Sequence, residues 1–241
     1  MEIKGKNVLI TGAGKRIGKE LAINFAKEGA NVVLHYRSSE REVKEVEEKI
    51  KSFGVKTLTV KADLTKMEDV YFLIKESLLF FRKIDILINN ASIYYKTPLE
   101  ETTEKDLDIF YQVHVKAPFF LSKELGKVMY ENKEGRIVNI VDYAPLRPYR
   151  DFLAYEVSKG AMLTMTRAFA KEFAPYVLVN AVLPGPIVPA EGIEDLEKPL
   201  KKTVLKKWGG EKEVWKAVKY LVETEFTTGA FLPVEGGRLI C

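Results

Sequence analysis

The stretch Thr11-Gly12-Ala13-Gly14-Lys15-Arg16-Ile17-Gly18 follows a short apolar run, Asn7–Thr11, and opens an amphipathic segment. In this strand-turn-helix context, backbone N–H groups and a helix N-terminus are presented to a pyrophosphate. Gly12 and Gly18 hold the outer positions of a G-x-x-x-R-x-G frame, with Arg16 where a middle glycine often stands. On this motif alone, an ordinary strand-to-helix loop remains an open alternative.

Short apolar runs alternate with amphipathic stretches along the rest of the chain. Strands are predicted at Asn7–Thr11, Asn31–His35, Lys56–Val60, Ile84–Asn89, Arg136–Val141, Val177–Leu183 and Ala230–Val234. Most show little polar alternation, as expected for strands covered on both faces. The alternation with helices predicts βαβ units and a parallel sheet.

Two helices can be placed from their apolar spacing. Ile17, Leu21 and Phe25 recur every four residues, and Gly29 suits the position just after that helix. A second helix is expected from about Lys159 to Phe173, with a stripe of Met162, Met165, Phe169 and Phe173.

No linker or repeat divides the 241 residues, so a single domain over residues 1–241 is expected. The stretch 184–207 carries four prolines and many charges with weak periodicity. It is interpreted as a surface excursion that helps to form the substrate site, not as a domain boundary.

Composition limits the functional classes. A net charge of +4, with lysines mixed among glutamates as in Lys44–Lys51, does not suggest nucleic-acid binding. With Cys241 the only cysteine and His35 and His114 the only histidines, no disulfide and no Cys/His metal site are expected. Met1 lies just before the first strand, leaving no room for a signal peptide, and no apolar run is long enough to span a bilayer. A cytoplasmic protein is expected.

The end of the second strand indicates which cofactor is preferred. NAD-dependent enzymes usually place an acid there for the ribose 2′-OH, whereas His35-Tyr36-Arg37-Ser38-Ser39 has none before Glu40. Because a guanidinium offers forked donors to phosphate oxygens, NADPH is predicted, with Arg37 and Ser38 as the main contacts. A merely solvated Arg37 is the alternative.

Tyr155-x-x-x-Lys159 is expected at the start of a helix, and residues four apart share a helix face. A lysine ammonium beside a phenol is expected to lower the pKa of the tyrosine and so fit it for proton transfer. Taken alone, the motif is common by chance.

Several motifs occur in order with this pair. They are the Gly12–Gly18 turn, Asp63-Leu64, Asn89-Asn90-Ala91-Ser92, Pro184-Gly185 and Glu235-Gly236-Gly237. Over essentially the whole chain they resemble the short-chain dehydrogenase/reductase family. The resemblance implies a single-domain α/β Rossmann fold, a doubly wound seven-stranded parallel sheet flanked by helices, and hydride transfer from NAD(P)H. It also implies a homodimer or homotetramer.

The turn and the resemblance together give an expected cofactor site. Asp63 and Leu64 would lie near the adenine, Asn90 and Ala91 beneath the ribose, and Lys159 on the nicotinamide ribose hydroxyls. The full expected set is Gly12, Gly14, Arg16, Ile17, Gly18, Tyr36, Arg37, Ser38, Asp63, Leu64, Asn90, Ala91, Ser92, Tyr155, Lys159, Pro184, Gly185 and Ile187.

Three positions depart from the family pattern. Asp142 stands thirteen residues before Tyr155, where the family usually has a serine that helps to hold a substrate carbonyl. His114 replaces a helix asparagine, and Pro189 replaces a frequent threonine. A histidine at this helix position is more often a satisfied packing residue, although a weakened proton relay stays open.

Asp142 changes the expected chemistry. An ionised carboxylate only accepts hydrogen bonds and would repel the negative charge that develops on a carbonyl oxygen. It suits a substrate with N–H donors or a protonated ring nitrogen, such as a pterin or dihydrofolate. A surface aspartate outside the substrate site is the alternative.

The pteridine reductase branch of the family has this aspartate. The chain also resembles that branch at Arg16, in the His35–Ser38 segment, and in Tyr94-Tyr95-Lys96-Thr97-Pro98-Leu99. The resemblance implies transfer of the pro-S hydride of NADPH to the carbon of a ring C=N bond, with Tyr155, Lys159 and Asp142 as catalytic residues. Tyr94 or Tyr95 would form an aromatic wall, and Arg16 would contact substrate as well as pyrophosphate; core packing and a ligand-free arginine are the alternatives.

Two other functions stay open. A 3-oxoacyl-carrier-protein reductase or general carbonyl reductase fits the overall similarity, but Asp142 counts against it. A cofactor-binding protein without turnover is favoured by His114, Asp142 and Pro189, whereas the retained Tyr155 and Lys159 argue against it.

Overall fold

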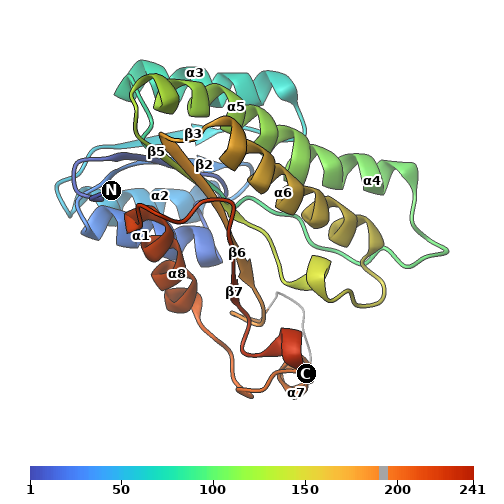
Figure 1. The fold of residues 1–241 in the computed structure, drawn as a ribbon. Coiled ribbons are helices and arrows are strands. Elements are labelled where there is room, and N and C mark those ends of the chain that lie inside the picture. The colour runs from blue at the N-terminus through green and yellow to red at the C-terminus, as the bar shows by residue number, and fades with distance from the viewer. Residues whose placement is uncertain (190–194) are drawn as a thin grey trace.

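The computed structural model describes residues 1–189 and 195–241, which form one seven-stranded sheet with helices on both faces (Figure 1). The strands are β1 (Asn7–Ile10), β2 (Asn31–Tyr36), β3 (Thr57–Lys61), β4 (Ile86–Asn89), β5 (Gly135–Ile140), β6 (Val177–Pro184) and β7 (Phe231–Val234). All neighbours pair in parallel, in the order β3-β2-β1-β4-β5-β6-β7. The predicted fold class is confirmed, and each predicted strand is present with ends that differ by at most two residues.

The helices are α1 (Arg16–Lys27), α2 (Glu40–Lys51), α3 (Met67–Phe81), α4 (Glu104–Tyr111), α5 (Ala117–Glu131), α6 (Leu153–Glu172), α7 (Lys198–Lys201) and α8 (Glu211–Glu223). A π-helical turn, Gln112–Lys116, joins α4 to α5. Short 3₁₀ turns cover Ala144–Leu146 and Arg238–Ile240. Residues 190–194, within the predicted excursion 184–207, lie outside the described residues.

Apolar side chains on the two faces of the sheet build two separate cores. One packs α1, α2 and α8 against the sheet, with Phe25 and Trp215 in edge-to-face contact at 4.9 Å. The other packs α3, α5 and α6 against the opposite face. β7 lies at the edge of the sheet, where Pro233 lacks an N–H without breaking an interior ladder.

The apolar stripe places the start of α6 too late, whereas the Tyr155-x-x-x-Lys159 motif does lie at the start of the helix, as predicted. The helix begins at Leu153 rather than near Lys159, so Tyr155 and Lys159 both lie in its first two turns. The apolar stripe from Met162 onwards is buried as predicted, but the earlier turns carry Tyr155, Ser158 and Lys159 on the buried side. Because the inward-facing residues of these turns are polar, the sequence shows no apolar spacing of helical period there. Gly29 does follow α1, with a left-handed φ of +85°.

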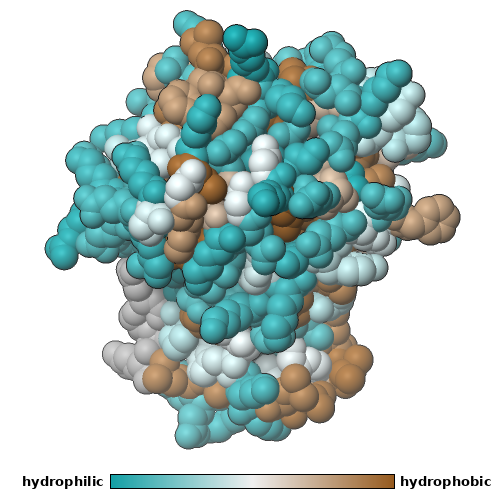
Figure 2. All heavy atoms as spheres, turned by 90° about the vertical axis from the view of Figure 1, so that its left-hand side faces the viewer, coloured by the Kyte–Doolittle hydropathy of each residue, from teal (hydrophilic) through white to brown (hydrophobic). Residues whose placement is uncertain are grey.

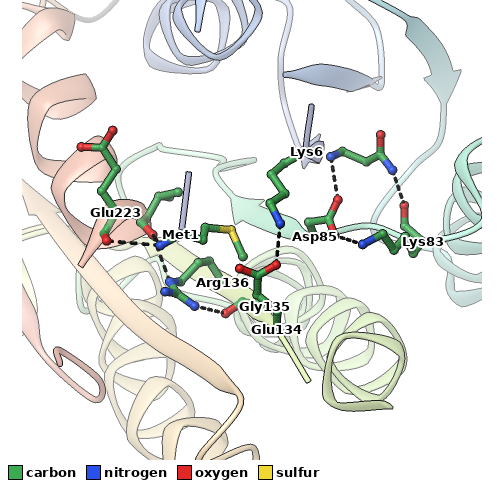
Figure 3. A network of polar contacts seen from close by, with 10 residues as sticks. Met1, Lys6, Lys83, Asp85, Glu134, Gly135, Arg136 and Glu223 are labelled. Carbon is green, nitrogen blue, oxygen red and sulfur yellow. Dashed lines mark hydrogen bonds and ion pairs between the residues drawn. The ribbon is translucent and has the colours of Figure 1, made fainter. Parts of the chain in front are cut away.

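The strand order reverses at β1 and β4, whose carboxyl ends lie side by side. In doubly wound sheets ligands bind in the crevice at that point. Charged groups lie at the amino ends of the strands, on the other side of the sheet from this crevice. Figure 3 shows those around Met1, Arg136 and Asp85. Asp85 accepts a bond from the Asn7 N–H at 2.9 Å and pairs with Lys83 at 2.7 Å. Among the described residues, no helix is long and apolar enough to cross a membrane.

Candidate active site

The glycine turn lies at the carboxyl end of β1, beside β4. Thr11 Oγ1 accepts bonds from the N–H groups of Asn90 and Ala91, both at 2.9 Å. The Asn90 amide in turn donates to the carbonyls of Thr11 and Gly12, at 2.8 and 3.1 Å. These bonds fix the turn to the chain that leaves β4.

Glycine is required at both outer positions of the turn. Gly12 has φ +67°, in the left-handed region. A Cβ on Gly18 would lie 2.0 Å from the Gly12 carbonyl oxygen, so α1 meets the turn with no room for a side chain. Arg16 also has a positive φ, +51°, which explains why glycine often stands at its position.

The residues of the turn fit a dinucleotide pyrophosphate. The first backbone bond at the start of α1 runs from Lys19 N to Lys15 O at 3.2 Å. Within the described part of the chain, the N–H groups of Gly14, Ile17 and Gly18 have no acceptor. Amides at a helix start, together with the helix dipole, are suited to bind phosphate oxygens.

His35 supports the turn from below, a role that the sequence did not indicate. Its Nδ1 accepts the Gly12 N–H at 3.0 Å, so Nε2 carries the proton and donates to the Ala62 carbonyl at 3.0 Å. Burial lowers the pKa of His35 to about 4. A neutral imidazole therefore connects β2, β3 and the phosphate-binding turn.

The remaining expected cofactor residues lie along the same edge of the sheet. Arg37 and Ser38 are exposed just after β2. Just after β3, Asp63 Oδ1 accepts hydrogen bonds from the Thr65 N–H and hydroxyl. Tyr36, Leu64, Pro184 and Ile187 are buried, and Gly185 follows β6. The Arg16 guanidinium donates to the carbonyls of Pro189 and Val188 at 2.8 and 3.1 Å, so it contacts the chain just after Ile187.

Tyr155 and Asp142 form a direct pair. The Tyr155 hydroxyl donates to Asp142 Oδ2 at 2.8 Å, and Asp142 Oδ1 accepts the Ala144 N–H at 2.7 Å. Asp142 follows β5 and Tyr155 lies in the first turn of α6. Asp142 is therefore in direct contact with the predicted catalytic tyrosine.

The electrostatics of the pair differ from the expectation. Burial, followed by the Asp142 charge, raises the pKa of Tyr155 well above 10, so the predicted lowering by Lys159 is wrong in this structure. The Lys159 ammonium donates to the Ile140 carbonyl at 3.1 Å and lies 5.8 Å from the centre of the Tyr155 ring. Burial lowers the pKa of Lys159 to about 8 and raises that of Asp142. Tyr155 thus keeps its proton at neutral pH, and Asp142 protonates more readily than an exposed aspartate.

His114 is a satisfied, buried residue of the π-helical turn. Nε2 accepts the Ile93 N–H at 3.2 Å, so Nδ1 carries the proton and donates to Ser158 Oγ at 2.8 Å. Ser158 then donates to the Tyr155 carbonyl at 2.7 Å. Burial and the nearby Lys159 charge keep the pKa of His114 well below 6.5. The histidine links the segment after β4, through Ser92 as well, to the start of α6.

Aromatic rings surround the tyrosine. Tyr94 stacks on Phe152 with centroids 4.6 Å apart and meets the Tyr155 ring edge-to-face at 5.0 Å. Tyr149 approaches Tyr94 through their hydroxyls, 3.5 Å apart. Tyr95 points away, donating to Asp106 at 3.0 Å and packing on Phe110. Of the two tyrosines considered as a substrate wall, only Tyr94 contacts Tyr155.

Tyr149 and Arg238 were not expected near the site. Arg238 lies in the C-terminal 3₁₀ turn, yet its guanidinium carbon is 5.0 Å from the centre of the Tyr143 ring. No local pattern could have indicated this contact, because only the fold brings the C-terminus beside Asp142. Within the described residues, no group of three or more His, Cys, Asp or Glu side chains is arranged to hold a metal ion.

Comparison with known proteins places these features in a family. The model of the short chain dehydrogenase family matches residues 6–198. An uncharacterized oxidoreductase of Thermotoga maritima is 37% identical, with 98% of each chain covered. Glucose 1-dehydrogenase 2 of Bacillus subtilis is 33% identical over 99% of this chain and 96% of its own. Alternative dihydrofolate reductase 1 (FolM) of Brucella canis, solved in complex with NADP, has a TM-score of 0.92 and 30% identity, covering 100% of this chain and 97% of that one.

Proposed function

Since the chain belongs to the short-chain dehydrogenase family and is an NAD(P)H-dependent oxidoreductase, we propose that it reduces a ring C=N bond of a pterin- or dihydrofolate-type substrate with NADPH. The hydrogen bond between Tyr155 and Asp142 carries this proposal. A ketone oxygen placed against Tyr155 would also face a carboxylate, which repels developing negative charge. A ring nitrogen that must gain a proton is favoured by the same pair of groups.

NADPH supplies the hydride when it is bound at the carboxyl edge of the sheet. The Gly12–Gly18 turn would hold the pyrophosphate, Arg37 and Ser38 the 2′-phosphate, and Asn90 and Lys159 the nicotinamide ribose. The likeness to a dihydrofolate reductase solved with NADP supports this choice of cofactor.

The residues around Tyr155 have separate roles in moving the proton. Tyr155 holds its hydroxyl proton because burial and Asp142 raise its pKa. As hydride bonds to the ring carbon, the electron pair of the C=N bond moves to nitrogen, which takes a proton from Tyr155 or from protonated Asp142. Asp142, whose pKa is raised by burial, then returns a proton from solvent to the site. Lys159 balances the negative charge that arises on the phenol.

Tyr94 and Phe152 would provide the flat apolar surface for the ring. They stack on each other, with Tyr94 directed edge-on toward Tyr155. Such a wall orients an aromatic ring without adding charge. The aromatic wall and the carboxylate together match an amino-pyrimidine ring better than an aliphatic ketone.

Carbonyl reduction is the second candidate. It is favoured by the Tyr155–Lys159 arrangement itself and by the likeness to glucose 1-dehydrogenase 2. NADPH oxidation should be followed with dihydrobiopterin, dihydrofolate and an acetoacetyl thioester at matched concentrations. We expect turnover of at least one dihydropterin; turnover of the thioester alone would overturn the proposal.

A further inference from the structure

The C-terminal turn Arg238–Ile240 brings a cation to the substrate side of the site. The Arg238 guanidinium lies over the ring of Tyr143, the residue after Asp142. Its Nη1 donates to the Pro199 carbonyl in α7 at 2.6 Å. Arg147 holds the turn in place by donating to the backbone carbonyl of Arg238. Arg238 is therefore fixed between the β5–α6 loop and α7.

The charge of Arg238 acts on the groups of the site. Burial raises the pKa values of Tyr94, Asp142 and Tyr143, that of Tyr143 to about 12, and the charge of Arg238 opposes each increase. The guanidinium is thus close to the aromatic wall and to the proton-transfer pair. It is only partly buried, and a guanidinium has five N–H donors, so donors remain for a ligand.

The segment 195–207, whose Pro199 carbonyl accepts a hydrogen bond from Arg238, carries more cations than acids. The exposed cations of the segment 195–207 are Lys198, Lys201, Lys202, Lys206 and Lys207. Asp195 and Glu197 are the acids among the described residues of that same segment, 195–207. Leu205 and Ile240 are exposed. Apolar side chains gather at the lower end of the molecule in Figure 2, the end at which Figure 1 shows α7 and the C-terminus. A substrate that extends from the site past Arg238 meets positive charge and apolar surface.

We propose that Arg238 is a specificity-determining residue that binds a carboxylate carried on the ring's substituent. This inference rests on the proposed function and narrows its substrate to the dihydrofolate type, whose side chain ends in an amino acid, over dihydrobiopterin, whose side chain is uncharged. A guanidinium binds a carboxylate through two parallel hydrogen bonds. Arg238 takes no part in hydride or proton transfer.

The test compares two substrates and three variants. The values of kcat/KM for dihydrofolate and for dihydrobiopterin are measured with the unmodified protein, R238Q, R238K and K212Q. Lys212 is an exposed cation on α8, so K212Q removes one charge elsewhere. We expect R238Q to lose about ten- to a hundredfold in kcat/KM with dihydrofolate, mainly through KM, because a charge-assisted bond is lost. Activity with dihydrobiopterin should change less than threefold, which also shows that R238Q is folded. R238K should lose less than R238Q, and K212Q nothing.

Different outcomes would overturn the proposed function and the proposed role of Arg238. Turnover of neither dihydropterin by the unmodified protein would overturn the proposed function and this inference with it. Turnover of both substrates, with R238Q lowering the two kcat/KM values equally or not at all, would overturn the role of Arg238 alone.

Discussion

The proposed function depends on Asp142, which stands where the family usually has a serine. The serine usual at this position can donate a hydrogen bond to a ketone oxygen, whereas Asp142 Oδ2 accepts a hydrogen bond from the Tyr155 hydroxyl at 2.8 Å. We expect Asp142→Ser to lower kcat with a dihydropterin about a hundredfold, because a positioned proton-transfer group is lost. The same variant should gain activity toward a small ketone. The measurement is kcat for both substrates; unchanged dihydropterin reduction would contradict the role of Asp142.

Arg37 is expected to set the cofactor preference. It is exposed just after β2, and its charge, after the hydrogen bonds from Thr65, lowers the pKa of Asp63. Arg37→Asp should reverse the ratio of kcat/KM for NADPH over NADH, since a carboxylate repels a 2′-phosphate and binds a 2′-OH. A ratio that does not move would show that Arg37 is only a solvated loop residue.

His35 is expected to make the free energy of unfolding depend on pH. Its pKa is about 4 in the fold and 6.5 in the unfolded chain, so the unfolded state binds a proton first as pH falls. Stability from this residue is complete above pH 6.5 and is lost as pH falls toward 4, by about 3 kcal/mol.

The variant His35→Asn tests this linkage, because its amide oxygen can still accept the Gly12 N–H. Urea unfolding at pH 7.5 and at pH 4.5 should show a smaller loss of stability for the variant than for the unmodified protein. An equal loss would assign the acid sensitivity to other groups, such as buried His114.

At the scale of elements, the C-terminus of α8 is held by two cations (Figure 3). Arg136 donates to the carbonyls of Val222 and Thr224, both at 3.0 Å, and the Met1 amine donates to Val222 and Glu223. The carbonyls at a helix end lack partners of their own and carry partial negative charge.

Arg136→Met should therefore lower the free energy of unfolding by about 2–4 kcal/mol, since buried carbonyls lose their donors. The matched control is Arg41→Met, because Arg41 is exposed and a surface ion pair contributes little. Urea denaturation measures both. Equal effects of the two variants would contradict the assigned cap.

The elements differ in how well the sequence predicts them. The strands are continuous apolar runs bounded by polar residues, so their ends are predicted within two residues. The apolar spacing alone misses the first turns of α6, because Tyr155, Ser158 and Lys159 face inward there and a buried polar face has no apolar period. Asp142 and Tyr155 were identified from spacing, whereas Arg238 and His35 act through contacts that only the folded chain creates.

At the scale of the whole molecule, we propose a homodimer or homotetramer. Phe119 is 42% exposed beside an apolar hollow on α5 and α6 that also includes Ala168 and Phe169. A second copy of the chain would bury this surface. Light scattering should give a multiple of the 27.4 kDa chain mass, and Ala168→Arg should reduce it. A 27.4 kDa particle for the unmodified protein at micromolar concentration would contradict the proposal.

The path of the hydride tests the central claim most directly. Dihydrofolate is incubated with the unmodified protein and NADPH carrying deuterium at the pro-S position of C4, and the product is examined by mass spectrometry and NMR. We predict one deuterium on the ring carbon of the reduced C=N bond and its loss from the nicotinamide. A reduced product without deuterium at that carbon would contradict transfer of the pro-S hydride to a ring C=N bond by this site.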